Sequence, residues 1–191
     1  MNKDPNWVLF KNGNHNAFEK LYREHISGLY DYGKRFSVDT AIIEDCIQDM
    51  FIDLWNKREK LNDVENVKSY LFVSFKRRLV RMLTKKKVFD SIDENNYFDI
   101  ELSVESIMEK MEMDSEKITK LKNAFEKLSK NQQHILYLKF YQGFSNKEIS
   151  EILQINYQST RNALTRALTK LKTHFLIFFT LLNFILLTKF F

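Results

Sequence analysis

The chain has 191 residues, 44% of them hydrophobic, which is enough for one sizeable core or two small ones because a domain usually takes about 100 to 200 residues. Four Gly and one Pro are too few for an all-β fold, whose turns recur every ~8 to 12 residues, and a single cysteine excludes an internal disulfide or a zinc site built on several cysteines. The net charge of +5 is unevenly distributed: residues 67–87 carry eight basic and no acidic side chains, whereas residues 88–118 carry ten acidic and two basic ones. Since the N-terminus has no apolar signal-peptide segment, we expect a cytoplasmic protein. The patterns along the chain predict an all-α fold.

Residues 1–87 predict a four-helix bundle. A short helix follows the cap signal Asp4-Pro5, a second follows Asn14, and two more span about residues 39–62 and 65–85. In the last three of these helices apolar residues recur at steps of three and four. Each helix therefore has an apolar stripe that it can bury against the others.

An acidic segment over residues 88–116 divides the chain, and we expect it to be a linker because its apolar periodicity is weak. Residues 117–173 predict a second small helical domain. Ser129 and Ser145 each begin a capping box, in which the Ser and the Gln or Glu three residues later satisfy the free amides of a helix start. A short helix over residues 146–153, a three-residue turn and a last helix give this domain the spacing of a helix-turn-helix.

The last helix predicts a surface that reads duplex DNA. Its polar side carries Arg, Asn and Gln, which can bond a base edge through two atoms, and the first turns of a recognition helix reach deepest into the major groove. The predicted base-reading residues are Gln158, Ser159, Arg161 and Asn162, with Lys147 and Arg166 placed for phosphates. The alternative is a basic helix face that only meets solvent.

The fourth predicted helix combines the basic residues of 67–87 with aromatic ones. Cations that meet phosphates, beside rings on which unpaired bases stack, describe a surface for single-stranded DNA. The residues expected on it are Lys68, Tyr70, Phe72, Lys76, Arg77 and Arg81. In the alternative interpretation the aromatic side chains belong to the core and the cations only cover the other face.

The third predicted helix is acidic. Asp45, Asp49 and Asp53 lie four residues apart and therefore share a face. A catalytic or metal site would draw His or further carboxylates from a second element, and none is evident, so we expect neither an enzyme nor a bound metal or cofactor. A protein-binding face fits better, with ordinary solvated charge as the competing interpretation.

Five segments resemble the two regions of an extracytoplasmic-function sigma factor, in order and at similar spacing, and with the linker they cover residues from about 5 to 173. The segments are AFEKLYREH, IIEDCIQDMFIDLWNKRE, VKSYLFVSFKRR, LSKNQQHILYLKFYQGFSNKEISEIL and INYQSTRNALTRALTKL. The resemblance implies a factor that directs core RNA polymerase to promoters. Its N-terminal domain, region two, would grip the polymerase clamp and melt the −10 element, and its C-terminal domain, region four, would read the −35 element as duplex and dock on the polymerase flap.

The resemblance also implies roles for individual residues. The clamp-facing motif corresponds to Asp45, Gln48, Asp49 and Phe51, and Trp55 matches an aromatic residue at the end of the same helix. Tyr70 and Leu71 match the start of the helix that meets the −10 strand, while Arg77 and Arg81 stand where many members have an Asn and an acidic residue. Gln154 replaces the Gly usual in the helix-turn-helix turn, at a cost of about 1 kcal/mol if its φ is positive. An anti-sigma factor is a further candidate partner, beside core RNA polymerase and promoter DNA.

Residues 174–191 form a hydrophobic tail. Its apolar run from Phe175 to Leu187 has 13 residues, short of the about 20 that span a bilayer. We expect the tail to continue the last helix and to pack on a partner or on the protein's own core, with shallow membrane contact and a tail without function as less favoured alternatives. The competing function from another class is a stand-alone helix-turn-helix regulator whose N-terminal bundle dimerises or binds a ligand.

Overall fold

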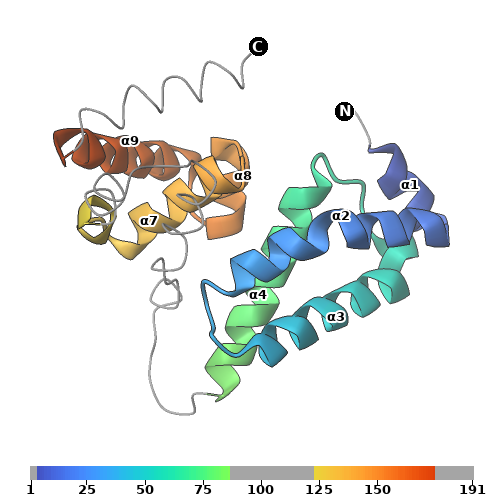
Figure 1. The fold of residues 1–191 in the computed structure, drawn as a ribbon. Coiled ribbons are helices and arrows are strands. Elements are labelled where there is room, and N and C mark those ends of the chain that lie inside the picture. The colour runs from blue at the N-terminus through green and yellow to red at the C-terminus, as the bar shows by residue number, and fades with distance from the viewer. Residues whose placement is uncertain (1–3, 87–122, 175–191) are drawn as a thin grey trace. The chain divides into compact units, whose positions relative to one another are not determined.

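The computed structural model describes residues 4–86 and 123–174, and the predicted linker and hydrophobic tail lie outside these residues. The described residues belong to two compact units, one N-terminal and one C-terminal (Figure 1). All regular secondary structure in the described residues is helical, which confirms the predicted fold class.

Residues 4–86 of the N-terminal unit contain four α-helices and one short turn of 3₁₀ helix. They are α1 (Pro5–Lys11), α2 (His15–Gly33), α3 (Thr40–Lys57), η1 (Arg58–Lys60) and α4 (Val67–Lys86). The predicted caps are confirmed, because side-chain oxygens of Asp4 and Asn14 accept hydrogen bonds from the first backbone amides of α1 and α2. Asp39 caps α3 in the same way. α3 packs against α4, and α2 packs against both.

The core of this unit forms where the apolar stripes of α2, α3 and α4 meet. Its most deeply buried side chains include Leu21, Leu29, Ile43, Ile47, Leu71, Phe75 and Leu79. Gly33 lets α2 approach α3, because a Cβ added there would lie 2.5 Å from Cγ2 of Ile43. Trp7 of α1 closes one end of the core, and its indole N–H donates to the carbonyl of Asn62 at 3.1 Å.

The C-terminal unit contains α7 (Lys130–Leu136), the π-helical turn η3 (Tyr137–Tyr141), α8 (Asn146–Leu153) and α9 (Tyr157–His174), with α7 packed against α9. Both predicted capping boxes are present. The Ser129 hydroxyl accepts from the Gln132 amide while the Gln132 side chain accepts from the Ser129 amide, and Ser145 and Glu148 exchange the same two bonds.

The turn between α8 and α9 has the hydrogen bonds of a Schellman motif. The Gln154 amide donates to the Glu151 carbonyl at 3.3 Å, and the Ile155 amide donates to the Ser150 carbonyl at 3.1 Å. Gln154 adopts φ 56°, which is a positive φ, so the cost expected from the sequence for Gln at this position applies. Gln therefore occupies a left-handed position that Gly would adopt about 1 kcal/mol more easily.

The α7 helix does not end as a regular α-helix. Its last turn widens over η3, where the Gln142 amide donates to the carbonyl of Tyr137, five residues earlier, at 3.1 Å. The Gln142 side chain donates to the Tyr137 hydroxyl at 2.9 Å, so this wider turn is fixed by a second bond. Gly143, with φ 76°, then ends the segment.

Candidate functional site

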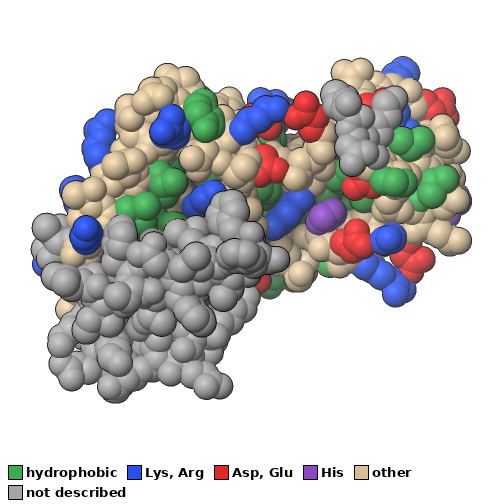
Figure 2. Space-filling model, turned by 90° about the horizontal axis from the view of Figure 1, so that it is seen from above, with side chains coloured by type: hydrophobic (Ala, Val, Ile, Leu, Met, Phe, Trp, Pro, Cys, Tyr) green, Lys and Arg blue, Asp and Glu red, His purple; other side chains and the backbone are tan. Residues whose placement is uncertain are grey.

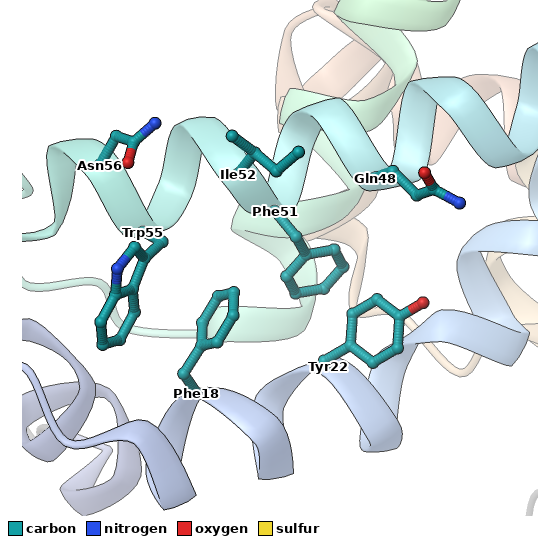
Figure 3. Close-up of a pocket in the computed structure, with 7 residues that line it drawn as sticks. All are labelled: Phe18, Tyr22, Gln48, Phe51, Ile52, Trp55 and Asn56. Atoms are coloured by element: carbon teal, nitrogen blue, oxygen red, sulfur yellow. The ribbon is translucent and has the colours of Figure 1, made fainter.

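An apolar groove lies between α2 and α3 (Figure 3). Its volume is about 330 Å³, and its lining consists of Phe18, Tyr22, Gln48, Phe51, Ile52, Trp55 and Asn56. The four aromatic rings point toward one another, with centroids 4.9 Å apart for Tyr22 and Phe51 and 5.0 Å apart for Phe18 and Trp55. Ile52 is 57% exposed, so the groove offers a large apolar surface to a partner.

Trp55 is held in place at one end of the groove. The His15 ring lies 4.4 Å from it, centroid to centroid, and the Arg58 guanidinium lies 4.6 Å from its ring. Arg58 also donates to the Trp55 backbone carbonyl at 2.9 Å. A half-buried indole with fixed neighbours loses little conformational entropy on binding, which suits it to anchor a protein partner.

The predicted acidic face of α3 is divided between two surroundings. Asp45 is exposed, whereas Asp49 and Asp53 turn toward α4. The Arg78 guanidinium bonds the Asp53 carboxylate and lies 3.5 Å from that of Asp49. Phe51 is only 3% exposed and forms the floor of the groove.

The six residues predicted to bind single-stranded DNA occupy two opposite sides of α4. Positions 70, 77 and 81 share one side, on which Arg77 and Arg81 are exposed and Tyr70 is half-buried against Trp7. Positions 68, 72 and 76 follow each other at steps of four on the other side.

The prediction for Phe72 is wrong. Its ring is fully buried and lies 5.1 Å from that of Tyr32, centroid to centroid, so no base can stack on it. Lys76 is only 3% exposed and is not presented to DNA either. Lys68 is half-buried, with its ammonium 5.8 Å from the Phe72 ring. Phe72 and Lys76 are buried because the buried side of α4 is wider than the stripe of Leu71, Phe75 and Leu79 indicates.

The predicted DNA-reading residues of α9 lie together on its exposed side. Gln158, Ser159, Arg161, Asn162 and Arg166 are all exposed, and Lys147 is exposed at the start of α8. Figure 2 shows exposed Lys and Arg side chains over both described parts of the chain.

The orientation of α9 is set by its buried side. Thr160 and Ala167 are fully buried, and Leu171 is 1% exposed. The start of the helix is fixed by Asn156, whose side-chain oxygen accepts from the Ser159 amide at 2.6 Å. The remaining side of the first two turns therefore faces solvent with its polar residues free to meet DNA.

Two described groups have a clearly shifted pKa, and neither belongs to a candidate surface. Burial raises the pKa of the Cys46 thiol to about 12, with Asp49 adding to this effect and Arg78 opposing it. Burial lowers the pKa of His25, with Glu24 opposing this effect and Lys68 adding to it. In residues 4–86 and 123–174 no group of three or more His, Cys, Asp or Glu side chains could hold a metal ion. Within the same ranges no helix combines the length and apolar character needed to cross a membrane.

Sequence reasoning did not assign Phe18, Tyr22 and Ile52 to a site. The first two belong to the apolar stripe of α2, and nothing in that stripe shows which of its residues stay accessible once α3 is packed beside it. Ile52 is the exception, because an apolar residue on the acidic side of α3 is a signal that could have been used.

Comparison with known families identifies both units. Residues 21–88 match Sigma-70 region 2, and residues 118–171 match Sigma-70, region 4. Together the two matches cover more than half of the chain, which therefore belongs to the sigma-70 family of RNA polymerase sigma factors. It directs promoter-specific transcription initiation, with core RNA polymerase and promoter DNA as its partners. The region 2 match favours the sigma factor over a stand-alone helix-turn-helix regulator, because it covers the N-terminal bundle as well.

Solved structures share the fold. The chain is similar to CnrH, solved in complex with the cytosolic domain of CnrY, with 17% identity, a TM-score of 0.57 and coverage of 88% of this chain and 93% of that one. It is also similar to the sigma factor RpoE from Bartonella quintana, solved in complex with the anti-sigma factor NepR, with 19% identity, a TM-score of 0.54 and coverage of 84% and 97%. A search of curated proteins found no match.

Proposed function

We propose that this sigma factor, of the extracytoplasmic-function group, meets its partners through three separate surfaces. The groove between α2 and α3, together with the exposed Asp45 of α3, binds the polymerase clamp. The side of α4 with Tyr70, Arg77 and Arg81 binds the −10 strand, and the first turns of α9 read the −35 duplex. The observation that carries this division is that α3, α4 and α9 each expose the residue types that one of the three partners requires.

The polymerase surface is supported by the aromatic lining of the groove. Interfaces depend on a few aromatic or aliphatic anchors that fill pockets on the partner, and exposed charges around them contribute mainly to orientation and association rate. Trp55 and Ile52 are suited to be such anchors, and Gln48 and Asp45 supply the polar margin. Asp49 contributes less to polymerase binding than the family motif implies, because its carboxylate lies near the Arg78 guanidinium.

The polymerase surface is tested by Ile52→Asp, with Val38→Asp as its matched control. Both side chains are exposed and apolar, Ile52 at 57% and Val38 at 91%, but Val38 precedes α3 and does not line the groove. We expect Ile52→Asp to weaken binding of the full chain to core polymerase at least tenfold and Val38→Asp to leave it unchanged. Equal effects of the two substitutions would contradict the assignment of the groove.

The proposed −10 surface is the exposed side of α4. Arg77 and Arg81 supply cations for phosphates, and the half-buried Tyr70 is the aromatic residue on the same side of the helix. We expect Arg77→Ala to weaken the binding of holoenzyme to a −10 single strand and to reduce the salt dependence of binding, because fewer counterions are released. A salt dependence equal to that of the unsubstituted protein would contradict a phosphate contact at this position.

The −35 surface is tested by a pair of substitutions in the C-terminal unit. Arg161→Ala should relax sequence preference at the −35 element, because Arg can bond a base edge through two atoms. Lys147→Ala should lower affinity nearly equally across sequences, since a phosphate contact carries no sequence information. Equal loss at cognate and scrambled −35 sites for Arg161→Ala would refute its role in base reading.

We further propose how the chain is divided into domains and which partner regulates it. Residues 1–87 and 117–173 form the two functional domains, joined by the acidic linker of 88–116 and followed by the tail of 174–191. The chain works in the cytoplasm and catalyses no covalent step itself. An anti-sigma factor is a candidate partner, supported by the two similar structures, since RpoE was solved with the anti-sigma factor NepR and CnrH with the cytosolic domain of CnrY.

A further inference from the structure

Two amide side chains on the exposed side of α9 are bonded to each other. The Gln158 Nε2 donates to the Asn162 Oδ1 at 3.1 Å, across one helical turn. Both side chains are exposed, and the backbone beneath them is fixed by the Asn156 cap and by the buried Thr160. The bond therefore joins two groups that already point away from the core.

This bond determines which hydrogen-bonding groups remain available. A carboxamide has two N–H donors and an oxygen with two lone pairs. Asn162 gives one lone pair of Oδ1 to Gln158, and it keeps the other lone pair and both of its donors. Its free edge thus presents one donor and one acceptor side by side, in an orientation that Gln158 restricts.

Only one base offers the matching pair of groups in the major groove. Adenine presents the N7 acceptor beside the N6 amino donor, whereas guanine presents two acceptors, N7 and O6. Thymine has an acceptor and a methyl group, and cytosine has a donor alone. An Asn that bonds N7 through Nδ2 and N6 through Oδ1 would place the same Oδ1 against O6 of guanine, where two acceptors repel.

We infer that the Gln158–Asn162 pair reads an adenine in the −35 duplex, with Asn162 contacting the base and Gln158 acting as a positioning residue that orients its carboxamide. This inference rests on the proposed role of α9 and specifies the base that this part of the helix selects. The second lone pair of Oδ1 allows Gln158 to stay bonded while Asn162 accepts from the adenine N6 amino group.

The inference is tested with the full chain bound to core polymerase and a promoter library randomised at the −35 element. We expect Asn162→Ala to reduce the preference for adenine about tenfold at a single position and to leave the other positions unchanged. Arg161→Ala is the matched control, since it should relax a different position. Asn162→Asp should move the preference at the Asn162 position toward cytosine, because a carboxylate only accepts hydrogen bonds.

Modified DNA separates the base contact from a general weakening of binding. Replacing that adenine by 7-deazaadenine removes only the N7 acceptor, so it should weaken binding of the unsubstituted protein and have no effect on the Asn162→Ala protein. Gln158→Ala should lower the preference at the same position by a smaller factor. The double substitution should cost less than the product of the two single effects, because Gln158 acts through Asn162.

The inference would be overturned by an equal loss on all duplexes, by a preference for a base other than adenine at that position, or by multiplicative effects of the two single substitutions. In each of these cases a retained effect of Arg161→Ala on sequence preference would leave the proposed role of α9 standing. Loss of all dependence on the −35 sequence in the unsubstituted holoenzyme would instead overturn the proposed role itself. Because both side chains are exposed, unchanged thermal unfolding of the variants is the control for folding.

Discussion

Arg78 of α4 bonds the carboxylate of Asp53 on α3, and this contact joins the basic helix of the N-terminal unit to the acidic one. The guanidinium is also 3.5 Å from the Asp49 carboxylate, and Lys57 lies 3.8 Å from Asp53. The surfaces proposed for polymerase and for the −10 strand are therefore adjacent and share a charged boundary. Part of the charge that the sequence shows on each helix is compensated by the other.

This ion pair is expected to contribute little, because exposed pairs usually give about 0.2–1 kcal/mol. A double-mutant cycle with Arg78→Ala and Asp53→Asn should give a coupling free energy in that range for urea unfolding. The matched pair Glu19 and Arg23 on α2 is more exposed, with side chains 56% and 76% exposed against 43% and 30%, and should give a smaller coupling. A larger coupling for the α2 pair would contradict this ranking.

Replacing Gln154 by Gly is expected to make the protein more stable. Because its φ is 56°, Gln154→Gly should stabilise the C-terminal unit by about 1 kcal/mol, measured by chemical unfolding. Glu151→Gly is the control, since Glu151 lies within α8, where Gly costs about 1 kcal/mol. Destabilisation by both substitutions would show that the side chain of Gln154 makes a contribution that outweighs its backbone strain.

The two sides of α4 should separate stability from DNA binding. Phe72 is fully buried, so Phe72→Ala should cost about 3–5 kcal/mol of unfolding free energy. Arg77 is exposed, so Arg77→Ala should change stability by less than about 0.5 kcal/mol while weakening the −10 complex. A Phe72→Ala protein with unchanged stability and impaired strand binding would restore the original prediction for this residue.

Cys46 should be unreactive while the protein is folded. It is fully buried and its pKa is about 12, so at pH 8 about one thiol in ten thousand is ionised, and the thiolate is the reactive form. We expect a thiol reagent such as iodoacetamide to modify Cys46 only as fast as the N-terminal unit unfolds, with rapid reaction in denaturant as the control. Modification within minutes under native conditions would contradict the burial of this side chain.

The features that the sequence predicts well are those that depend on neighbours along the chain. The caps at Asp4 and Asn14 and the boxes at Ser129 and Ser145 need only a side chain and an amide within three residues, and all of them are present. The turn at Gln154 is similar, because its conformation follows from the end of one helix and the start of the next.

Features that depend on packing between helices were predicted less well. On α4 the stripe of Leu71, Phe75 and Leu79 leaves open on which side the buried surface widens. Contact between Phe72 and Tyr32 of α2 settles this, and no pattern within α4 carries that information. The groove is missed for the same reason, because Phe18 and Tyr22 become a surface only once α3 lies beside them.

The central claim is that this chain makes core RNA polymerase specific for promoters through these surfaces. Run-off transcription with purified core polymerase and a promoter library tests it most directly. We predict product from a defined subset of promoters only when the full chain is added, with loss of that product for Ile52→Asp and not for Val38→Asp. Absence of chain-dependent, promoter-specific product would contradict the account, and so would full activity of the Ile52→Asp protein.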